Sequence, residues 1–124
     1  MKKILIVDDQ KGVRRLLEEL FKRNGWEVEL ATDGKEAIEK VDRIILDVVL
    51  MDMKMPHMNG LEASQLILKK HGCLDIIMMT AYGEMEIVKE ALDVGVKKCV
   101  TKPFDIIELC DTVNQVVGNK AQMG

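Results

Sequence analysis

Three carboxylates, a hydroxyl and a lysine stand at or directly after the ends of short apolar runs; they are Asp8, Asp9, Asp52, Thr80 and Lys102. Short apolar runs of this kind are typical of strands that are buried on both faces of a parallel sheet. In open sheets of parallel strands, ligands bind just beyond the carboxyl ends of the strands. The five side chains are therefore expected to meet at one edge of a sheet, around Asp52.

The chemistry that this set suits is phosphoryl transfer onto a carboxylate. Asp8, Asp9 and Asp52 would repel one another if left alone, and a divalent cation with oxygen ligands relieves that repulsion. Mg²⁺ fits a site that offers few carboxylates together with waters and a phosphate oxygen. Lys102 supplies a fixed positive charge, and Thr80 supplies a hydroxyl that can donate to a phosphoryl oxygen. Asp52 is then the attacking nucleophile.

The chain alternates between apolar strand patterns and amphipathic helix patterns. Strands are expected over residues 4–7, 26–30, 47–52, 76–79 and 99–100, and helices over residues 13–21, 35–46, 61–70, 84–94 and 105–117. Gly95 is expected to stop the fourth helix, and Asp105 to cap the last. Such alternation predicts an α/β fold, a five-stranded parallel sheet with helices on both faces in the flavodoxin-like strand order 2-1-3-4-5.

Length and composition fit one ordinary globular domain. Of the 124 residues 48% are hydrophobic and 31% charged, and we assign a domain to residues 1–119 and a tail to residues 120–124. A formal charge of −3 without a basic stripe disfavours nucleic-acid binding. The three cysteines form no C-x-x-C pair, so that neither disulfides nor a zinc site is favoured, and they are interpreted as small buried hydrophobes.

The start of the chain places lysines before an apolar run, as a signal peptide would. The run from Ile4 to Val7 is cut by Asp8-Asp9, which makes it far too short for the core of a signal peptide or for a membrane span. The sequence therefore predicts a cytoplasmic protein without membrane insertion.

Four blocks of the sequence resemble the signature blocks of the two-component response-regulator receiver family: Val7-Asp8-Asp9, Leu50-Met51-Asp52-Met53-Lys54-Met55-Pro56, Met79-Thr80-Ala81 and Lys102-Pro103-Phe104. They follow the family's order and spacing, and the resemblance covers essentially the whole chain. An isolated Asp-Asp pair is more often a turn or a helix cap, whereas four blocks at four strand ends are a specific signal.

The resemblance implies a role for each residue of the set. Asp52 is implied to be the phospho-acceptor, Thr80 a switch hydroxyl and Lys102 a phosphate-binding lysine. A cis peptide bond is implied before Pro103. The implied chemistry is self-catalysed, Mg²⁺-dependent phosphorylation and dephosphorylation of the aspartate rather than conventional enzyme turnover.

The resemblance also implies how the metal is held. The expected ligands are the carboxylates of Asp9 and Asp52 and the backbone carbonyl of Lys54, with Asp8 acting through water. Mg²⁺ is the expected ion, and Mn²⁺ is an alternative with similar ligand preferences.

Within the family, the runs Asp9–Arg14, Thr80–Glu84 and Lys102–Ile106 most resemble carriers of the sporulation phosphotransferase type. Such a receiver takes phosphate from a sensor histidine kinase and passes it to a histidine phosphotransferase, and these are the expected partners. The protein is expected to be a monomer or a weak dimer. The expected docking face includes Gln10, Gly12, Val13, Leu16, Pro103 and Phe104.

Two other functions stay open. The receiver can instead regulate a separate effector or transcription factor, by dimerising or binding a target when phosphorylated, because receivers of nitrogen-regulation-type transcription factors share some of these runs. A flavodoxin-like cofactor binder is disfavoured, because Asp8-Asp9 in the first strand–helix loop would repel a phosphate that lacks a metal.

Three features depart from the family pattern. Cys99 takes the position, three before the lysine, where many receivers carry a rotating aromatic. Lys54 and Tyr82 lie two residues past the acceptor and the switch hydroxyl, where we hypothesise that their bulk obstructs an attacking water. Ile44-Ile45-Leu46 replaces a polar, proline-containing loop, and either extends the second helix or leaves an apolar patch for self-association.

Overall fold

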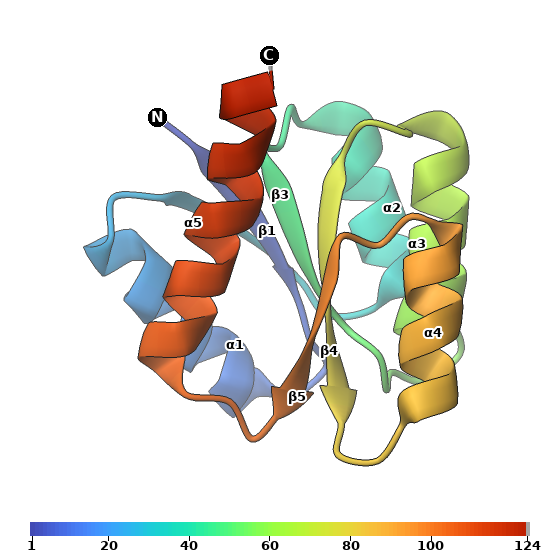
Figure 1. Cartoon of the computed structure of the whole chain (residues 1–124). Coiled ribbons are helices and arrows are strands. Elements are labelled where there is room, and N and C mark those ends of the chain that lie inside the picture. Colours follow the sequence, from blue (N-terminus) through green and yellow to red (C-terminus); the bar gives the residue numbers. More distant parts are fainter. Residues whose placement is uncertain (124) are drawn as a thin grey trace.

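The computed structural model describes the backbone of residues 1–123 and the side chains of residues 1–118. Within these residues five strands alternate with five helices (Figure 1). The elements are β1 (Lys3–Val7), α1 (Lys11–Arg23), β2 (Glu27–Ala31), α2 (Gly34–Arg43), β3 (Val48–Asp52), α3 (Gly60–Lys70), β4 (Asp75–Ala81), α4 (Met85–Val94), β5 (Lys98–Lys102) and α5 (Ile106–Met123). The strands are parallel and ordered β2-β1-β3-β4-β5, which confirms the predicted fold class and strand order.

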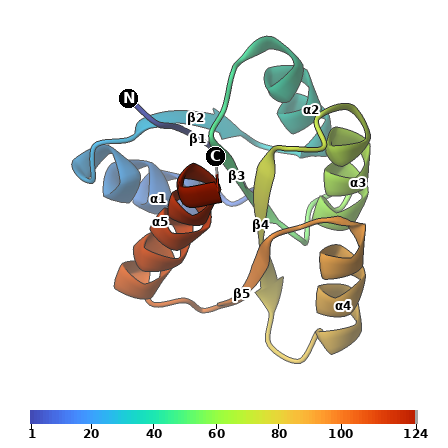
Figure 2. The same ribbon diagram turned by 45° about the horizontal axis from the view of Figure 1, so that its top comes forward.

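Helices cover both faces of the sheet, with α1 and α5 on one face and α2, α3 and α4 on the other (Figures 1 and 2). Side chains alternate between these faces along the inner strands. In β1, Ile4 and Ile6 pack with α1 and α5, while Leu5 and Val7 pack with the opposite layer. All four are completely buried. Burial on both faces explains why the inner strands read as continuous apolar runs.

Side-chain caps start three of the helices that follow a strand. Asp33 accepts a backbone N–H bond at the start of α2, and Asn59 and Glu62 form a capping box at the start of α3. Asp105 accepts two backbone N–H bonds in the first turn of α5, as the sequence predicts. Gly95 ends α4 in the left-handed region at φ +112°, which confirms the predicted stop.

The helix predicted over residues 35–46 is shorter in the structure, because α2 ends at Arg43. Ile44 has an extended backbone (φ −121°, ψ 135°), so the apolar triplet does not extend the helix. Ile44 and Leu46 turn toward the core while Ile45 is 94% exposed. The side chains of the triplet therefore alternate between core and solvent, as in an extended segment that leads into β3. Three consecutive apolar residues also fit a helical pattern, which is why the sequence favoured a longer helix.

The last two strands are longer than the sequence pattern indicates. Thr80 pairs with Thr101 and Ala81 with Lys102, so that the β4–β5 pairing continues to the edge of the sheet. Two of the polar site residues, Thr80 and Lys102, thus stand on regular strand backbone.

The final helix runs to Met123, beyond residue 117 where its apolar pattern ends. The predicted domain boundary at residue 119 and the tail over residues 120–124 lie beyond the described side chains, so this division stays a prediction. None of the helices in the described part of the chain is long and apolar enough to cross a membrane.

Candidate functional site

A cavity of about 320 Å³ opens at the carboxyl ends of the strands. The arrowheads of β4 and β5 mark these ends at the bottom of Figure 1. Asp8 is completely buried and joins this site through an ion pair with Lys102. The structure thus brings together all five residues that the sequence placed at strand ends, together with Lys54. The cavity is lined by Asp9, Gln10, Asp52, Met53, Lys54, Met79, Thr80, Ala81, Glu84 and Lys102.

Asp8, Asp9 and Asp52 form an acidic triad. One carboxylate oxygen of each lies within 4.8 Å of those of the other two. The three differ in access, because Asp8 is completely buried, Asp52 is 5% exposed and Asp9 is open to solvent. Asp8 is also held on both oxygens, accepting from the Gln10 N–H at 2.9 Å and from Lys102 at 2.8 Å.

Lys102 is the cation of the site. Its Nζ lies 2.8 Å from Asp8 Oδ2 and 3.1 Å from Asp52 Oδ1. Burial opposes the ammonium charge, but the hydrogen bond to Asp8 and the negative charges of Asp52 and Asp8 outweigh it, and the pKa of Lys102 is raised. Lys102 pairs with two of the three carboxylates of the triad, so that negative charge is left over for a bound cation.

The environment of Asp52 disfavours its charged form. Burial, and then the charge of Asp8, raise its pKa from 3.8 to about 6, although Lys102 acts in the opposite direction. The carboxyl is therefore ionised at neutral pH but held there against an unfavourable environment.

Asp52→Asn is expected to raise the free energy of unfolding of the metal-free protein by about 2–3 kcal/mol above pH ~7. Below pH ~3 the carboxyl is protonated in both the folded and the unfolded state, so the gain vanishes there and grows as pH rises through the unfolded pKa of 3.8 toward the folded pKa of about 6. Urea unfolding in chelator across this pH range measures it. Asp93→Asn, at an exposed carboxylate of α4, is the control and is expected to show no such trend. A variant no more stable than the wild type at neutral pH contradicts the raised pKa.

Thr80 and Cys99 lie on the strands beside the cavity. Thr80 is 2% exposed, and its hydroxyl donates to the Val100 carbonyl on β5 at 3.4 Å, a long bond that is easily exchanged. Cys99 is half-buried in the core on the α4 side, and burial raises the pKa of its thiol. A cis peptide bond joins Lys102 and Pro103, as the resemblance implies.

Two residues that we expected to flank the phosphoryl group occupy different positions. Lys54 is exposed and lines the cavity. Tyr82 is 90% exposed and does not belong to the lining. The structure therefore supports a shielding role for Lys54 more than for Tyr82.

Three further residues shape the site, and sequence reasoning missed them. Arg14, on α1, donates to the backbone carbonyl of Asp8 at 2.7 Å. Glu84, in the β4–α4 loop, accepts from the N–H of Ala81 at 3.0 Å. A Cβ on Gly60 would lie 2.2 Å from the carbonyl oxygen of Asp52. Each depends on the path of the backbone around the cavity, which residue types and spacing alone do not reveal.

The donor set of the triad fits Mg²⁺. Its atoms are carboxylate oxygens, which a small hard cation prefers, and one of the three carboxylates is exposed and so leaves room for waters. The excess of carboxylates over ammonium groups and the raised pKa of Asp52 both favour binding of a cation. Among the described residues this is the group of acidic, histidine or cysteine side chains that could hold a metal ion.

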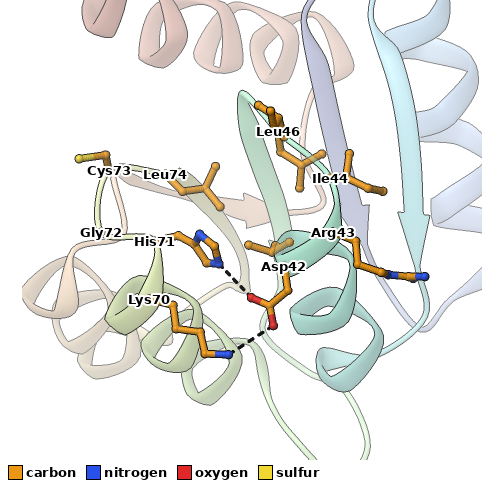
Figure 3. A pocket seen from close by; sticks show the side chains of 11 residues that line it. Asp42, Arg43, Ile44, Leu46, Lys70, His71, Gly72, Cys73 and Leu74 are labelled. Atoms are coloured by element: carbon orange, nitrogen blue, oxygen red, sulfur yellow. Dashed lines mark hydrogen bonds and ion pairs between the residues drawn. The ribbon is translucent and has the colours of Figure 1, made fainter.

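A second hollow, of about 530 Å³, lies where α2 and α3 end and the chain leads into β3 and β4. Figure 3 shows its lining residues from close by. It is lined by residues 41–46 and 70–74 and includes the exposed Ile45. Asp42 joins α2 to the end of α3 there, pairing with His71 at 2.9 Å and Lys70 at 3.4 Å. The hydrogen bond from His71 is the main cause that lowers the pKa of Asp42. Cys73 in this lining is exposed, so the interpretation of all three cysteines as buried was wrong for it.

A parallel sheet whose carboxyl edge carries an acidic triad and a lysine is the arrangement of a phospho-accepting receiver. The chain belongs to the response regulator receiver domain family, which matches residues 4–114. Receivers of this family are phosphorylated on an aspartate by histidine kinases in two-component systems, and the acidic triad is typical of their Mg²⁺ site.

Three proteins illustrate the relationship. The chain is 42% identical over 123 residues to Sporulation initiation phosphotransferase F of Bacillus subtilis, covering 96% of each. It is 43% identical over 107 residues to Regulatory protein AtoC of Escherichia coli, covering 86% of this chain and 23% of that protein. A solved structure of a CheY-like receiver domain protein from Methanospirillum hungatei matches with a TM-score of 0.96 at 27% identity, covering 100% of this chain and 99% of the other. The family expected from the sequence is confirmed.

Proposed function

We propose that the protein accepts a phosphoryl group from a sensor histidine kinase on Asp52 and passes it to a histidine phosphotransferase. The observation that carries the acceptor role is the 3.1 Å contact of Asp52 with Lys102 at the wall of an open cavity. Asp8 is completely buried and held on both oxygens, while Asp9 is exposed, and the ion pairs of Lys102 go to Asp8 and Asp52. Asp52 is thus the carboxylate that combines access with a fixed cation.

The transfer forms a bond between a carboxylate oxygen of Asp52 and phosphorus. The bond from phosphorus to the donor breaks, and its electron pair leaves with the donor's nitrogen or oxygen. Lys102 neutralises charge on the phosphoryl oxygens, and the Thr80 hydroxyl exchanges its long bond to Val100 for one of them.

The metal is part of the proposal. The carboxylates of Asp9 and Asp52 and the Lys54 carbonyl would hold Mg²⁺ or Mn²⁺, with Asp8 acting through water. When bound, the ion supplies further neutralisation of the phosphoryl charge. The protein's own contribution is to hold the nucleophile Asp52 beside Lys102. The hydrogen bond from Lys102 to the buried Asp8 fixes the position of the lysine ammonium.

The carrier role is supported by the similarity, over nearly the full length of both chains, to a relative named a phosphotransferase. The name of that relative also supports a role in sporulation, and the proposal includes the expected cytoplasmic location and a monomer or weak dimer. The alternative is regulation of a separate effector or transcription factor, which the similarity to a regulatory protein supports. Transfer of phosphate to a phosphotransferase histidine, rather than hydrolysis alone, distinguishes the two.

The acceptor is tested by incubating the protein with acetyl phosphate and Mg²⁺ and measuring the intact mass. We expect the wild type to gain one phosphoryl group and Asp52→Asn to gain none. The gain should disappear in chelator. A mass gain that persists in Asp52→Asn refutes the assignment of the site.

Lys54→Ala is expected to shorten the lifetime of the phosphorylated protein about three- to tenfold, because the lysine side chain at the cavity mouth obstructs an attacking water. The decay of intact phosphoprotein by mass spectrometry measures it. Lys97→Ala, at an exposed lysine before β5, is the control and should leave the decay unchanged. An unchanged or slower decay in Lys54→Ala rules out the shielding role.

A further inference from the structure

Glu84 is a carboxylate of the cavity lining that the proposed phosphoryl chemistry does not use. Its Oε1 accepts a hydrogen bond from the backbone N–H of Ala81 at 3.0 Å. Both residues line the same cavity as Asp52 and Lys102. A carboxylate is therefore bound to a backbone donor at the solvent-exposed side of the cavity that a phosphoryl group on Asp52 would enter.

Ala81 stands at the carboxyl end of β4 and lines the same cavity as Asp52, so its backbone N–H is a candidate donor for a phosphoryl oxygen. Ala81 ends β4 and pairs in register with Lys102, and Met79, two residues earlier, pairs with Asp52. A phosphoryl group on Asp52 brings several anionic oxygens into the cavity, more than one ammonium can satisfy. A backbone N–H fixed at a strand end is a preorganised donor for such an oxygen. The Glu84 carboxylate now occupies it.

Glu84 also directly precedes α4, which, like α1, starts without a side-chain cap, whereas α2, α3 and α5 are capped. The side chains of Asp33, Asn59 and Asp105 bond to the first turns of α2, α3 and α5. Glu84 makes no such bond to α4, because its carboxylate reaches back to Ala81. The start of α4 is thus tied to the cavity instead of being capped.

Building on the proposed acceptor role of Asp52, we propose that Glu84 is an autoinhibitory latch, whose carboxylate holds the Ala81 N–H in place of a phosphoryl oxygen until phosphorylation displaces it. The latch has two effects. Its negative charge opposes entry of an anionic phosphodonor, and its release frees the start of α4. Tyr82 and Met85 flank Glu84 in the chain and are 90% and 80% exposed. A movement of Glu84 would therefore alter the surface that these two side chains form.

The rate of phosphorylation tests the latch. With acetyl phosphate and Mg²⁺, Glu84→Ala is expected to be phosphorylated about five- to tenfold faster than the wild type, since it loses both the like charge and the competing acceptor. Glu84→Gln keeps an oxygen that can accept the Ala81 N–H but loses the charge, so its rate should lie between the two. Glu86→Ala and Glu86→Gln, at an exposed carboxylate in the first turn of α4, should match the wild type.

Outcomes separate the latch from the acceptor role. If the wild type is not phosphorylated on Asp52, the proposed function fails and the displacement step fails with it. If the wild type is phosphorylated but Glu84→Ala and Glu84→Gln are no faster, the latch alone is overturned. A rate increase that the Glu86 variants share is a general charge effect and also overturns it.

The contact itself has a readout that needs no phosphodonor. In ¹H–¹⁵N spectra, the amide proton of Ala81 should move upfield in Glu84→Ala, because it loses a charged acceptor, and should stay in place in Glu86→Ala. In the phosphorylated wild type, hydrogen exchange in the first turn of α4 should be faster than in the unphosphorylated protein. An Ala81 resonance unmoved by Glu84→Ala, or unchanged exchange at α4, contradicts the proposal.

Discussion

Lys102→Ala is expected to lower the free energy of unfolding of the metal-free protein by about 2–4 kcal/mol at neutral pH. Lys102 is the ammonium in contact with both Asp8 and Asp52, at 2.8 and 3.1 Å. Asp8 is completely buried and Asp52 nearly so, and removing one partner of a buried ion pair leaves uncompensated charge behind. Urea unfolding followed by circular dichroism, in buffer with chelator, measures the loss.

Two further variants and added Mg²⁺ test whether the loss of stability in Lys102→Ala comes from uncompensated charge. Adding Asp52→Asn to Lys102→Ala should recover part of the stability, because one of the stranded carboxylates is removed. Mg²⁺ should stabilise Lys102→Ala, because a cation at the triad replaces some of the missing charge and binds the folded state. Lys98→Ala, at an exposed lysine on the same strand, is the control and should cost less than about 0.5 kcal/mol. A Lys102→Ala variant as stable as this control shows that the ion pairs contribute nothing.

The convergence of the site could be predicted because strand ends obey simple rules. Each of Asp8, Asp52 and Thr80 stands at the end of an apolar run, and parallel strands bring such ends to one edge. The triad and its lysine followed from this placement, and the four sequence blocks implied the family. What each carboxylate does within the cluster depends on burial, which separates the sealed Asp8 from the exposed Asp9, and adjacent identical residues cannot show that difference.

The details that sequence reasoning missed are contacts across loops. The end of α2 was placed too late because Ile44, Ile45 and Leu46 suit a helix as well as an extended segment, and only packing against the core decides between them. Arg14 and Glu84 reach the site by side-chain bonds to the backbone of Asp8 and Ala81, six and three residues earlier in the chain. Such bonds produce no periodic pattern in the sequence. Any exposed polar residue at the same position would give the same hydrophobic pattern, so the pattern does not reveal the bond.

Gly60→Ala is expected to lower the free energy of unfolding by about 3 kcal/mol, by forcing the backbone of the site loop apart. An added Cβ would lie 2.2 Å from the Asp52 carbonyl oxygen and 2.9 Å from Met53 Cα, and both of these are backbone atoms that no side-chain rotation can relieve. The N–H of Gly60 also donates to the Met53 carbonyl at 2.8 Å, which fixes the start of α3 against the end of β3. Only glycine allows this approach.

The direction of the stability change in Gly60→Ala distinguishes a steric clash from helix propensity. Gly60 is the first residue of α3, where alanine would be the better helix former by up to about 1 kcal/mol, so propensity alone predicts stabilisation. Gly118→Ala, in α5 with no atom within 4 Å of its added Cβ, is the control and should stabilise. A Gly60→Ala variant as stable as Gly118→Ala would mean that the loop accommodates a methyl group without cost. If the loop moves instead, the displaced Asp52 carbonyl shifts the nucleophile from Lys102, and phosphorylation by acetyl phosphate should slow together with the loss of stability.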